Sequence, residues 1–424
     1  MLDISLVRDN TDVIRNMLRK RNLEYPLDNL LDLDKRRRNI ISKTQEHKRK
    51  RNLVSDEIAK MKKQNSNTTA KILEMKEISM LIVKGDQDVK ELDETISKLL
   101  ARLPNVPHES VPEGYEENDN LESRRWGEPR SFDFRIMDHI DLSFGLGLVD
   151  VDRAAKVAGS RFYFLKGDIV KLNYALINFA LDFMKKRGWT LIQPPYMLNE
   201  GAISGTIILS DFEDVIYKIE GEDLYLIGTS EHAIASMHMN EIIDGDKLPL
   251  RYAGVSTCFR KEAGAHGRDT KGIFRVHQFE KVEQFVFSKP EDSWKELELL
   301  INNAEDFFKA LELPYRVVTL CGGELGNVSA KTYDLEAWFP CQNKYREVVS
   351  CSNCTDYQAR GLLIKYRDKP HESSNYLHTL NGTLVATERT LLAILENYQT
   401  KEGTIIIPKA LQPYMGDTNI IKAQ

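Results

Sequence analysis

Five side chains within one short stretch of the chain have the types and spacing to bind a nucleoside triphosphate. They are two arginines, one aromatic residue and two carboxylates, namely Arg260, Glu262, Arg275, Phe279 and Glu283. A guanidinium can bind phosphate oxygens through two hydrogen bonds, and a carboxylate can accept one from an exocyclic amine. We expect Arg260 and Glu262 on one strand and the other three on a returning strand, because alternate residues of a strand share a face.

A solvated surface hairpin is the alternative, and a lone Arg-x-Glu pair would usually be one. The full string does not fit that alternative. FRKEAG and GRDTKGIFRVHQFEKVE resemble motif 2 of the class II aminoacyl-tRNA synthetases, and that of the seryl-tRNA synthetase family in particular. Three more segments agree in order, beginning at Gly228 (GTSEHAIASMH), Tyr345 (YREVVSCSNCTDYQARG) and Thr379 (TLNGTLVATERTLLAILENYQ).

The resemblance implies a role for each polar position of these segments. The residues expected to bind serine are Thr229, Ser230, Glu231, Arg260, Glu283 and Thr383. Those expected to bind ATP are Arg260, Lys261, Glu262, Arg275, Val276, Phe279, Glu347, Val348, Val349, Ser350 and Arg389. The catalytic residues are expected to be Arg260, Arg275 and Arg389, with Phe279 and Arg389 on opposite sides of the adenine. Glu347 and Ser350 would hold Mg²⁺ with the ATP phosphates.

Simpler interpretations exist for several of these positions. Thr229 precedes an apolar helical run and suits a helix N-cap, with Glu231 in the first turn. An isolated carboxylate such as Glu347 on a strand is usually just exposed, and Arg389 suits a helix surface. These three functional assignments therefore depend on the resemblance.

The chemistry implied by the resemblance has two steps in one site. The serine carboxylate attacks the α-phosphate of ATP to give seryl-adenylate and pyrophosphate, and a ribose hydroxyl at the 3′ end of tRNA(Ser) then takes the seryl group. Members of the family can also charge tRNA(Sec), which is a second candidate substrate. No side-chain nucleophile is required, so catalysis would come from positioning and charge stabilisation.

A long charged segment near the N-terminus, residues 28–103, has the apolar spacing of two helices packed as an antiparallel hairpin. Its second half steps by three and four through Met75, Ile78, Ile82, Gly85, Val89, Leu92, Ile96, Leu99 and Leu103. The first half continues the pattern less cleanly, with Thr44 and Arg51 at intervening seam positions, and residues 64–69 form a polar turn.

The charge of this segment differs from that of the rest of the chain. It carries 18 basic and 13 acidic residues, a net charge of +5, whereas the whole chain is −5. A basic rod on an acidic body is typical of a phosphate-binding arm, although a solvated coiled coil is the simpler alternative. The resemblance favours a tRNA-binding arm.

The rest of the chain predicts an α+β fold built on an antiparallel sheet. Strands are expected at 224–227, 250–259, 282–287, 315–319, 333–338 and 346–350, and helices at 291–311 and 388–398. A helix ending at Gly188 and a strand at 189–193 resemble motif 1, which implies a homodimer. Neither a Rossmann nor a P-loop glycine motif occurs. We expect a tRNA-binding domain at 1–105 and a class II catalytic domain at 106–424.

Composition limits the cofactors and the compartment. Five cysteines without framework spacing are typical of reduced thiols, and no second ligand pair accompanies the C-x-x-C at Cys351 and Cys354, so no zinc is expected. No apolar run approaches the roughly 20 residues of a membrane span, and the N-terminus lacks the apolar stretch of a secretory signal. A cytoplasmic protein without a membrane partner is expected.

Three other functions remain open from the sequence. An amino acid:carrier-protein ligase would share the catalytic motifs, but those relatives lack the basic arm. A catalytically inactive RNA-binding paralogue would be expected to lose Arg260, Glu262 or Arg389, and all three are present. A coiled-coil scaffold leaves the larger, C-terminal part of the chain unexplained.

Overall fold

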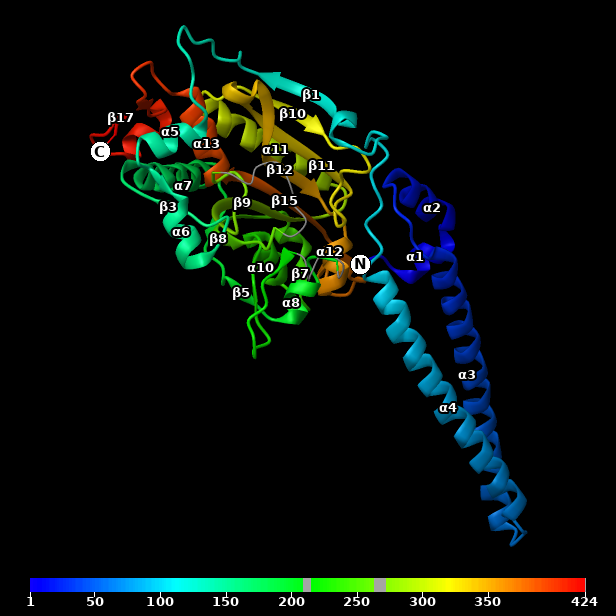
Figure 1. Ribbon diagram of the computed structural model, residues 1–424. Coiled ribbons are helices and arrows are strands. Elements are labelled where there is room, and N and C mark those ends of the chain that lie inside the picture. Colours follow the sequence, from blue (N-terminus) through cyan, green and yellow to red (C-terminus); the bar gives the residue numbers. More distant parts are fainter. Residues whose placement is uncertain (209–214, 263–271, 424) are drawn as a thin grey trace. The chain divides into compact units, whose positions relative to one another are not determined.

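The computed structural model describes residues 1–208, 215–262 and 272–423 (Figure 1). The chain forms two compact units. One contains Leu2–Leu18 and Leu23–Leu103, and the other contains Met1, Arg19–Asn22 and Pro104–Gln424.

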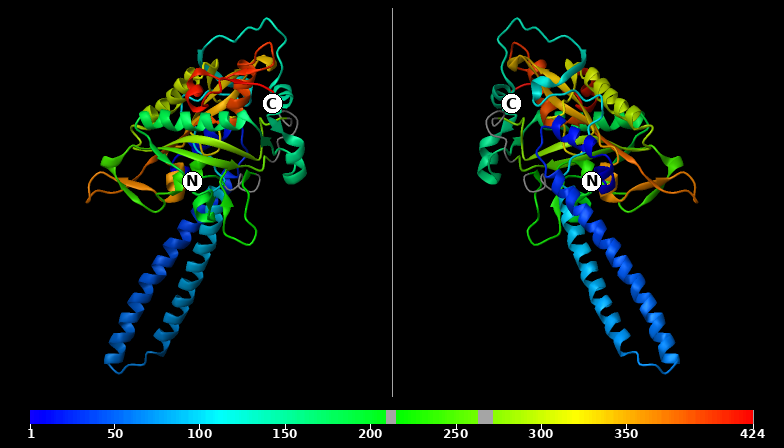
Figure 2. Two further views of the ribbon diagram at one scale, coloured as in Figure 1. Left: turned by 90° about the vertical axis from the view of Figure 1, so that its left-hand side faces the viewer. Right: turned by 90° about the vertical axis from the view of Figure 1, so that its right-hand side faces the viewer.

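The first unit is helical, as predicted, and is dominated by two long helices. After α1 (Ile4–Asp9) and α2 (Thr11–Lys20), α3 (Leu27–Lys63) and α4 (Thr69–Leu100) run antiparallel, side by side (Figures 1 and 2). The turn between α3 and α4 lies at the predicted place. The apolar seam of the distal half is formed by Val54, Ile58, Ile78 and Ile82.

The seam narrows where Gly85 of α4 meets Thr44 of α3. A β-carbon built on Gly85 would lie 2.2 Å from Thr44 Oγ1, so only glycine permits the present approach of the two helices. The expected seam is wrong in other places. Arg51 is exposed, and the charged Asp34 is buried, accepting hydrogen bonds from Arg8 and Arg38.

The second unit is built on a mixed, mainly antiparallel sheet of eight strands in the order β1-β10-β11-β12-β15-β9-β8-β4. In that order the strands are Leu121–Trp126, Tyr315–Thr319, Lys331–Phe339, Lys344–Asn353, His378–Ala386, Gln278–Ser288, Leu250–Phe259 and Thr190–Ile192. Only the pairing of β4 with β8 is parallel.

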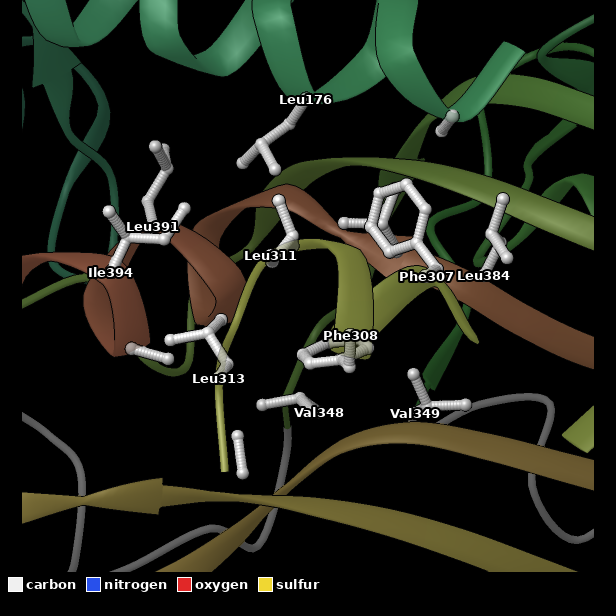
Figure 3. Close-up of a cluster of buried hydrophobic side chains, with 14 of the residues drawn as sticks. Leu176, Phe307, Phe308, Leu311, Leu313, Val348, Val349, Leu384, Leu391 and Ile394 are labelled. Atoms are coloured by element: carbon white, nitrogen blue, oxygen red, sulfur yellow. The ribbon is translucent and has the colours of Figure 1, made fainter. Parts of the chain in front are cut away.

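Three helices pack on one face of this sheet: α7 (Asp168–Lys186), α11 (Ser293–Ala310) and α13 (Thr387–Asn397). Figure 3 shows Leu176 of α7, Phe307 of α11 and Leu391 of α13 meeting in one cluster with Val349 of β12. Fully burying one such side chain is worth about 1.5–3 kcal/mol. This face therefore holds the sheet together, and the other face is available for a site.

Strand β9 shows how the two faces are divided. Val282 and Val286 lie in the core beneath the helices, and Gln284 donates to the Leu300 carbonyl of α11. The alternate residues Phe279 and Glu283 point to the opposite face. Core residues and cavity residues thus alternate along this strand, as the period of two predicts.

Shorter elements surround the sheet. The helices are α5 (His139–Gly145), α6 (Val151–Ala158), α8 (Glu200–Ser204), α10 (Ser230–Ser236) and α12 (Tyr357–Leu362). The small strands are β2 (Val149–Asp150), β3 (Phe164–Leu165), β5 (Met197–Leu198), β6 (Tyr225–Leu226), β7 (Ile242–Asp244), β13 (Lys365–Arg367), β14 (Asn375–Tyr376), β16 (Ile405–Ile406) and β17 (Ile420–Ile421). Within the described ranges no helix is both long and apolar enough to cross a membrane.

The close contact between Gly85 and Thr44 makes a testable prediction about the arm. Gly85→Ala should destabilise α3 and α4 by about 1–3 kcal/mol through overpacking, despite the better helix propensity of alanine. The double variant Gly85→Ala/Thr44→Ala should recover this loss, because the clashing hydroxyl is gone. Hydrogen exchange of the backbone amides of α3 and α4 in the full-length chain measures the loss of stability in the single variant and its recovery in the double variant. Equal exchange in the single and double variants would contradict the contact.

Candidate active site

A cavity of about 310 Å³ opens on the face of the sheet opposite the three core helices. Its lining includes these predicted site residues: Glu231, Arg260, Glu262, Arg275, Val276, Phe279, Glu283, Glu347, Val348, Ser350, Thr383 and Arg389. The lining comes from segments far apart in the chain, so the sheet topology brings the motifs together. Among the predicted residues, Thr229, Ser230, Lys261 and Val349 do not line it.

The predicted positions of the motif 2 residues on the strands are wrong in detail. β8 ends at Phe259, so Arg260 and Glu262 lie beyond it, and Glu262 has a left-handed φ of 51°. Arg275 also lies outside β9, which begins at Gln278. Arg260 and Glu262 therefore do not share a face through strand alternation. The intervening glycine loop lies largely outside the described residues.

Two of the three predicted catalytic arginines are paired with carboxylates. Arg275 Nη1 lies 3.0 Å from Glu262 Oε2, and Arg389 Nη1 lies 3.2 Å from Glu347 Oε1. Burial would raise the pKa of Glu347, but Arg389, with Arg260 and Arg275, holds it below its ordinary value. These guanidiniums are already in position to exchange a carboxylate partner for a phosphate.

Two aromatic rings accompany the guanidiniums. Arg260 Cζ lies 5.2 Å from the centre of the Phe279 ring, and Arg389 Cζ lies 5.1 Å from the centre of Phe274. Cations at such distances are attracted by the ring face. Phe274 was not predicted, since it stands in the sequence as an ordinary apolar residue. The cavity thus offers two rings and two planar cations to a flat base.

One corner of the cavity is arranged to recognise a hydroxyl group. Thr383 of β15 faces Glu283 of β9 in the strand register, and Thr383 Oγ1 donates to Glu283 Oε2 at 3.1 Å. The same carboxylate oxygen lies 2.5 Å from Lys281 Nζ. All three side chains are buried, and a buried charge must be paired. Lys281 was missed, because in the sequence it reads as one more lysine in a charged run.

Glu231 lies beside this corner, fixed by two amides. Gln358 Nε2 donates to Glu231 Oε1 at 2.8 Å, and Asn381 Nδ2 donates to the same oxygen at 3.1 Å. Gln358 is fully buried, and its own carbonyl accepts from Thr379 Oγ1. Burial raises the pKa of Glu231 to about 7, and Glu283 adds to the increase, whereas Lys281 opposes it. This carboxylate is poised to gain or lose its charge near neutral pH.

The other members of the Thr-Ser-Glu triplet have structural contacts. Thr229 caps α10 and accepts from the Glu231 backbone N–H, as the capping interpretation predicted. Ser230 is fully buried and donates to the Gly254 carbonyl. Both residues therefore hold Glu231 in place from the start of the helix.

A β-bulge explains how Glu347 and Ser350 of β12 reach the same cavity. Residues three apart on a regular strand face opposite sides, but the register of β12 with β11 slips by one residue between Glu347 and Val349. Next to Ser350 on β11 lies Asp334, which is nine-tenths buried. Burial and the charge of Glu347 raise the pKa of Asp334 well above its usual value, and its Oδ1 has no hydrogen-bond partner.

This donor set fits a hard cation. The oxygens of Glu347, Ser350 and Asp334 are what Mg²⁺ prefers, and one of them is buried without a partner. Among the described residues no group of three or more His, Cys, Asp or Glu is arranged to hold a metal ion by itself. That finding agrees with a cation that is held partly by substrate phosphates and water.

The C-x-x-C pair lies next to the cavity. Cys351 and Cys354 are free, buried thiols, and burial raises both pKa values well above the ordinary one. Asn381 Nδ2 lies 3.5 Å from Cys354 Sγ. Unreactive buried thiols of this kind act as packing residues.

The sequence did not predict five residues of the cavity. They are Phe274, Lys281, Asn381, Ala386 and Glu388. Alternation from Phe279 to Glu283 places Lys281 on the same face, so this position carried a usable signal. The other four gave no comparable signal.

An antiparallel sheet that carries paired arginines, aromatic rings and a carboxylate pocket on its open face is the architecture of a class II aminoacyl-tRNA synthetase. The model of the tRNA synthetase class II core domain (G, H, P, S and T) matches residues 215–398, and that of the seryl-tRNA synthetase N-terminal domain matches residues 1–107. The chain belongs to the seryl-tRNA synthetase family.

Individual relatives agree with this assignment. Serine–tRNA ligase of Nitrosopumilus maritimus is 56% identical over 417 residues, which are 98% of this chain and 99% of the relative. The crystal structure of seryl-tRNA synthetase from Pyrococcus horikoshii complexed with ATP has a TM-score of 0.96 at 48% identity and covers 100% of both chains. The cytoplasmic serine–tRNA ligase from Naegleria fowleri in complex with AMP has a TM-score of 0.89 at 41% identity, covering 100% of this chain and 99% of that one.

Proposed function

We propose that the chain activates L-serine with ATP and transfers the seryl group to the 3′ end of tRNA(Ser). The observation that carries this proposal is the buried corner of Lys281, Glu283 and Thr383, next to the carboxylate of Glu231 and the arginines of the same cavity. A buried hydroxyl-binding corner beside an ammonium-binding carboxylate suits a small hydroxy amino acid, and the family match favours serine. The carrier-protein ligase and the inactive paralogue are not favoured by the family match over both units.

The residue roles in this proposal are those that the family resemblance implies. Arg260 bridges the serine carboxylate and the α-phosphate, and Arg275 holds the distal phosphates. Arg389 and Phe279 enclose the adenine, and Glu262 accepts from its amine. Lys261, Val276, Val348 and Val349 belong to the segments that bind ATP. The guanidiniums stabilise the negative charge that develops on the phosphates.

The ammonium group of serine binds to Glu231, which Thr229 and Ser230 hold at the start of α10. The hydroxyl binds between Glu283 and Thr383. When alanine or glycine enters instead, these polar groups lose their partner, and the rate ratio between substrates can reach about 10⁴ or more.

A divalent cation, Mg²⁺, accompanies ATP in this proposal. Glu347 and Ser350 hold it together with the phosphates, and Asp334 supports them from β11. When bound, the cation neutralises the phosphate charge that builds up during attack on the α-phosphate. The side-chain oxygens of Asp334, Glu347 and Ser350 lie together on one face of the sheet.

The remaining assignments concern partners. Residues 1–105 form the tRNA-binding domain, with the arm at about 28–103, and residues 106–424 form the catalytic domain. The arm binds tRNA(Ser) through its excess of basic residues, and tRNA(Sec) is a second candidate for the same arm. The half-exposed Tyr174 and Leu191 of the motif 1 elements suit a homodimer interface. A cytoplasmic location suits this function.

Substitutions at Thr383 and Glu283 test the serine-binding corner. Thr383→Val should lower the preference for serine over alanine in ATP–pyrophosphate exchange by about ten- to hundredfold, the value of a buried hydrogen bond to a charged group. Glu283→Ala should abolish serine activation. Thr319→Val is a matched control, because Thr319 is equally buried on β10 of the same sheet but does not line the cavity. An unchanged serine KM and turnover in Glu283→Ala would rule out the assignment.

The pKa of Glu231 predicts how serine binding depends on pH. Below its pKa of about 7 the carboxyl is mostly protonated and cannot pair with the serine ammonium, so serine KM should rise about tenfold for each pH unit below 7. Gln358→Leu removes a donor that favours the ionised form, which should move the rise to higher pH. Exchange kinetics at saturating ATP, from about pH 6 to about pH 8, measure both. A flat profile in the unaltered enzyme would contradict the role of Glu231.

A further inference from the structure

Three consecutive residues outside the class II motifs, Arg161, Phe162 and Tyr163, contact the ATP-binding part of the cavity from behind. They follow α6, which ends at Ala158 and is capped by Gly159 with a φ of 98°, and they lead into β3. Their residue types alone do not indicate contact with a substrate. We call residues 161–163 the clasp.

The first end of the clasp holds motif 2. Arg161 Nη1 donates to the backbone carbonyl of Glu262 at 2.9 Å, and the backbone N–H of His277 donates to the Arg161 carbonyl at 3.1 Å. The rings of Phe162 and His277 lie 5.2 Å apart. One arginine thus joins the two sides of motif 2 beyond the ends of β8 and β9.

His277 extends this connection to Arg260. The Arg260 backbone N–H donates to the His277 carbonyl at 2.9 Å, and His277 Nδ1 lies 2.8 Å from the Arg260 carbonyl. A carbonyl can only accept, so Nδ1 carries the proton. The clasp therefore contacts His277, which is hydrogen-bonded to Arg260, as well as Glu262.

The second end of the clasp is anchored on α13. Tyr163 Oη donates to Glu388 Oε1 at 2.6 Å, and the same oxygen accepts from the Glu280 backbone N–H at 3.0 Å. Glu388 is 2% exposed and precedes Arg389. Burial raises the pKa of Glu388 well above its usual value, and the charge of Glu280 adds to the increase.

Glu262 needs such support. It lies beyond the last ladder residue of β8, and its left-handed φ of 51° persists only where the surroundings fix it. Arg161 has the same unusual backbone conformation, with φ 62°. Two strained residues joined by a guanidinium–carbonyl hydrogen bond form a preorganised pair.

We propose that Arg161 is a positioning residue that fixes Glu262 for recognition of the adenine amine, with Tyr163 and Glu388 anchoring the clasp. This inference rests on the proposed function, in which Glu262 accepts from that amine. Arg161 touches the Glu262 backbone rather than the nucleotide, so its contribution passes through Glu262.

The test compares ATP with purine riboside triphosphate, which lacks the 6-amino group, in serine-dependent pyrophosphate exchange. The variants are Arg161→Ala, Arg161→Lys, Tyr163→Phe and Glu262→Ala, the last of which removes the acceptor for the amine. Arg153→Ala is the matched control, because Arg153 lies on the adjacent α6, is 78% exposed in its side chain and pairs with Asp150. The full-length chain is used throughout.

Arg161→Ala should raise the KM for ATP about ten- to hundredfold, leave the serine KM within about twofold, and reduce the preference for ATP toward that of Glu262→Ala. Arg161→Lys should recover part of this preference, and Tyr163→Phe should shift it in the same direction as Arg161→Ala. Arg153→Ala should match the unaltered enzyme. Tyr163→Phe keeps the ring and gives the same readout if Arg161→Ala does not fold.

Three results would overturn the inference. An equal loss with both nucleotides in the Arg161 and Tyr163 variants would mean a general structural role. A normal preference in these variants, with the preference lost in Glu262→Ala, would mean that the clasp does not position Glu262, while the proposed function stands. If Glu262→Ala itself keeps the preference, the role of Glu262 in the proposed function and the clasp inference both fail.

Discussion

The buried charges of the cavity must be balanced within the protein, and the rest of the site depends on this constraint. Taking an ion from water into the interior costs several kcal/mol unless a partner is supplied. Glu283 is buried with Lys281, and Glu262, whose side chain is 13% exposed, pairs with Arg275. Glu347, whose side chain is 48% exposed, pairs with Arg389. Each pair places a group to which the proposed function gives a substrate-binding role.

The pairs differ in what they can do. Lys281 and Glu283 are both buried and remain together, so they form a permanent polar corner. The guanidiniums of Arg275 and Arg389 are more accessible, at 38% and 22% of their side chains, and can turn to phosphate oxygens. The proposed function accordingly assigns recognition of the amino acid to the fixed pair and phosphate binding to the adjustable ones.

The sheet makes these pairs possible because its two faces have separate tasks. α7, α11 and α13 bury one face with apolar side chains. On the other face three strands, β9, β12 and β15, each contribute polar residues to the cavity. The clasp supports the two places where the site extends beyond the ends of the strands.

Much of this could be predicted from the sequence. The strands at 250–259 and 315–319 begin and end where the apolar runs predicted, and the two long helices follow from their spacing. The predicted members of the cavity came from the motifs of the family. Strand alternation also separated the core residues of β9 from its site residues.

What the sequence could not give depends on local geometry and on distant partners. A bulge of one unpaired residue turns Glu347 and Ser350 to the same face. The residue types around it do not predict where it occurs. The sequence also does not show the left-handed conformation of Glu262 beyond the end of β8. Gln358 becomes meaningful only when Glu231 is seen 2.8 Å away.

The central claim is that the buried corner beside the arginines selects serine for activation and for transfer to tRNA. ATP–pyrophosphate exchange with each of the twenty amino acids, followed by charging of total tRNA with the amino acid that reacts, tests it most directly. Exchange with serine alone and transfer to a serine tRNA is the predicted result. Exchange with another small amino acid, activation without transfer, or no exchange at all would contradict it.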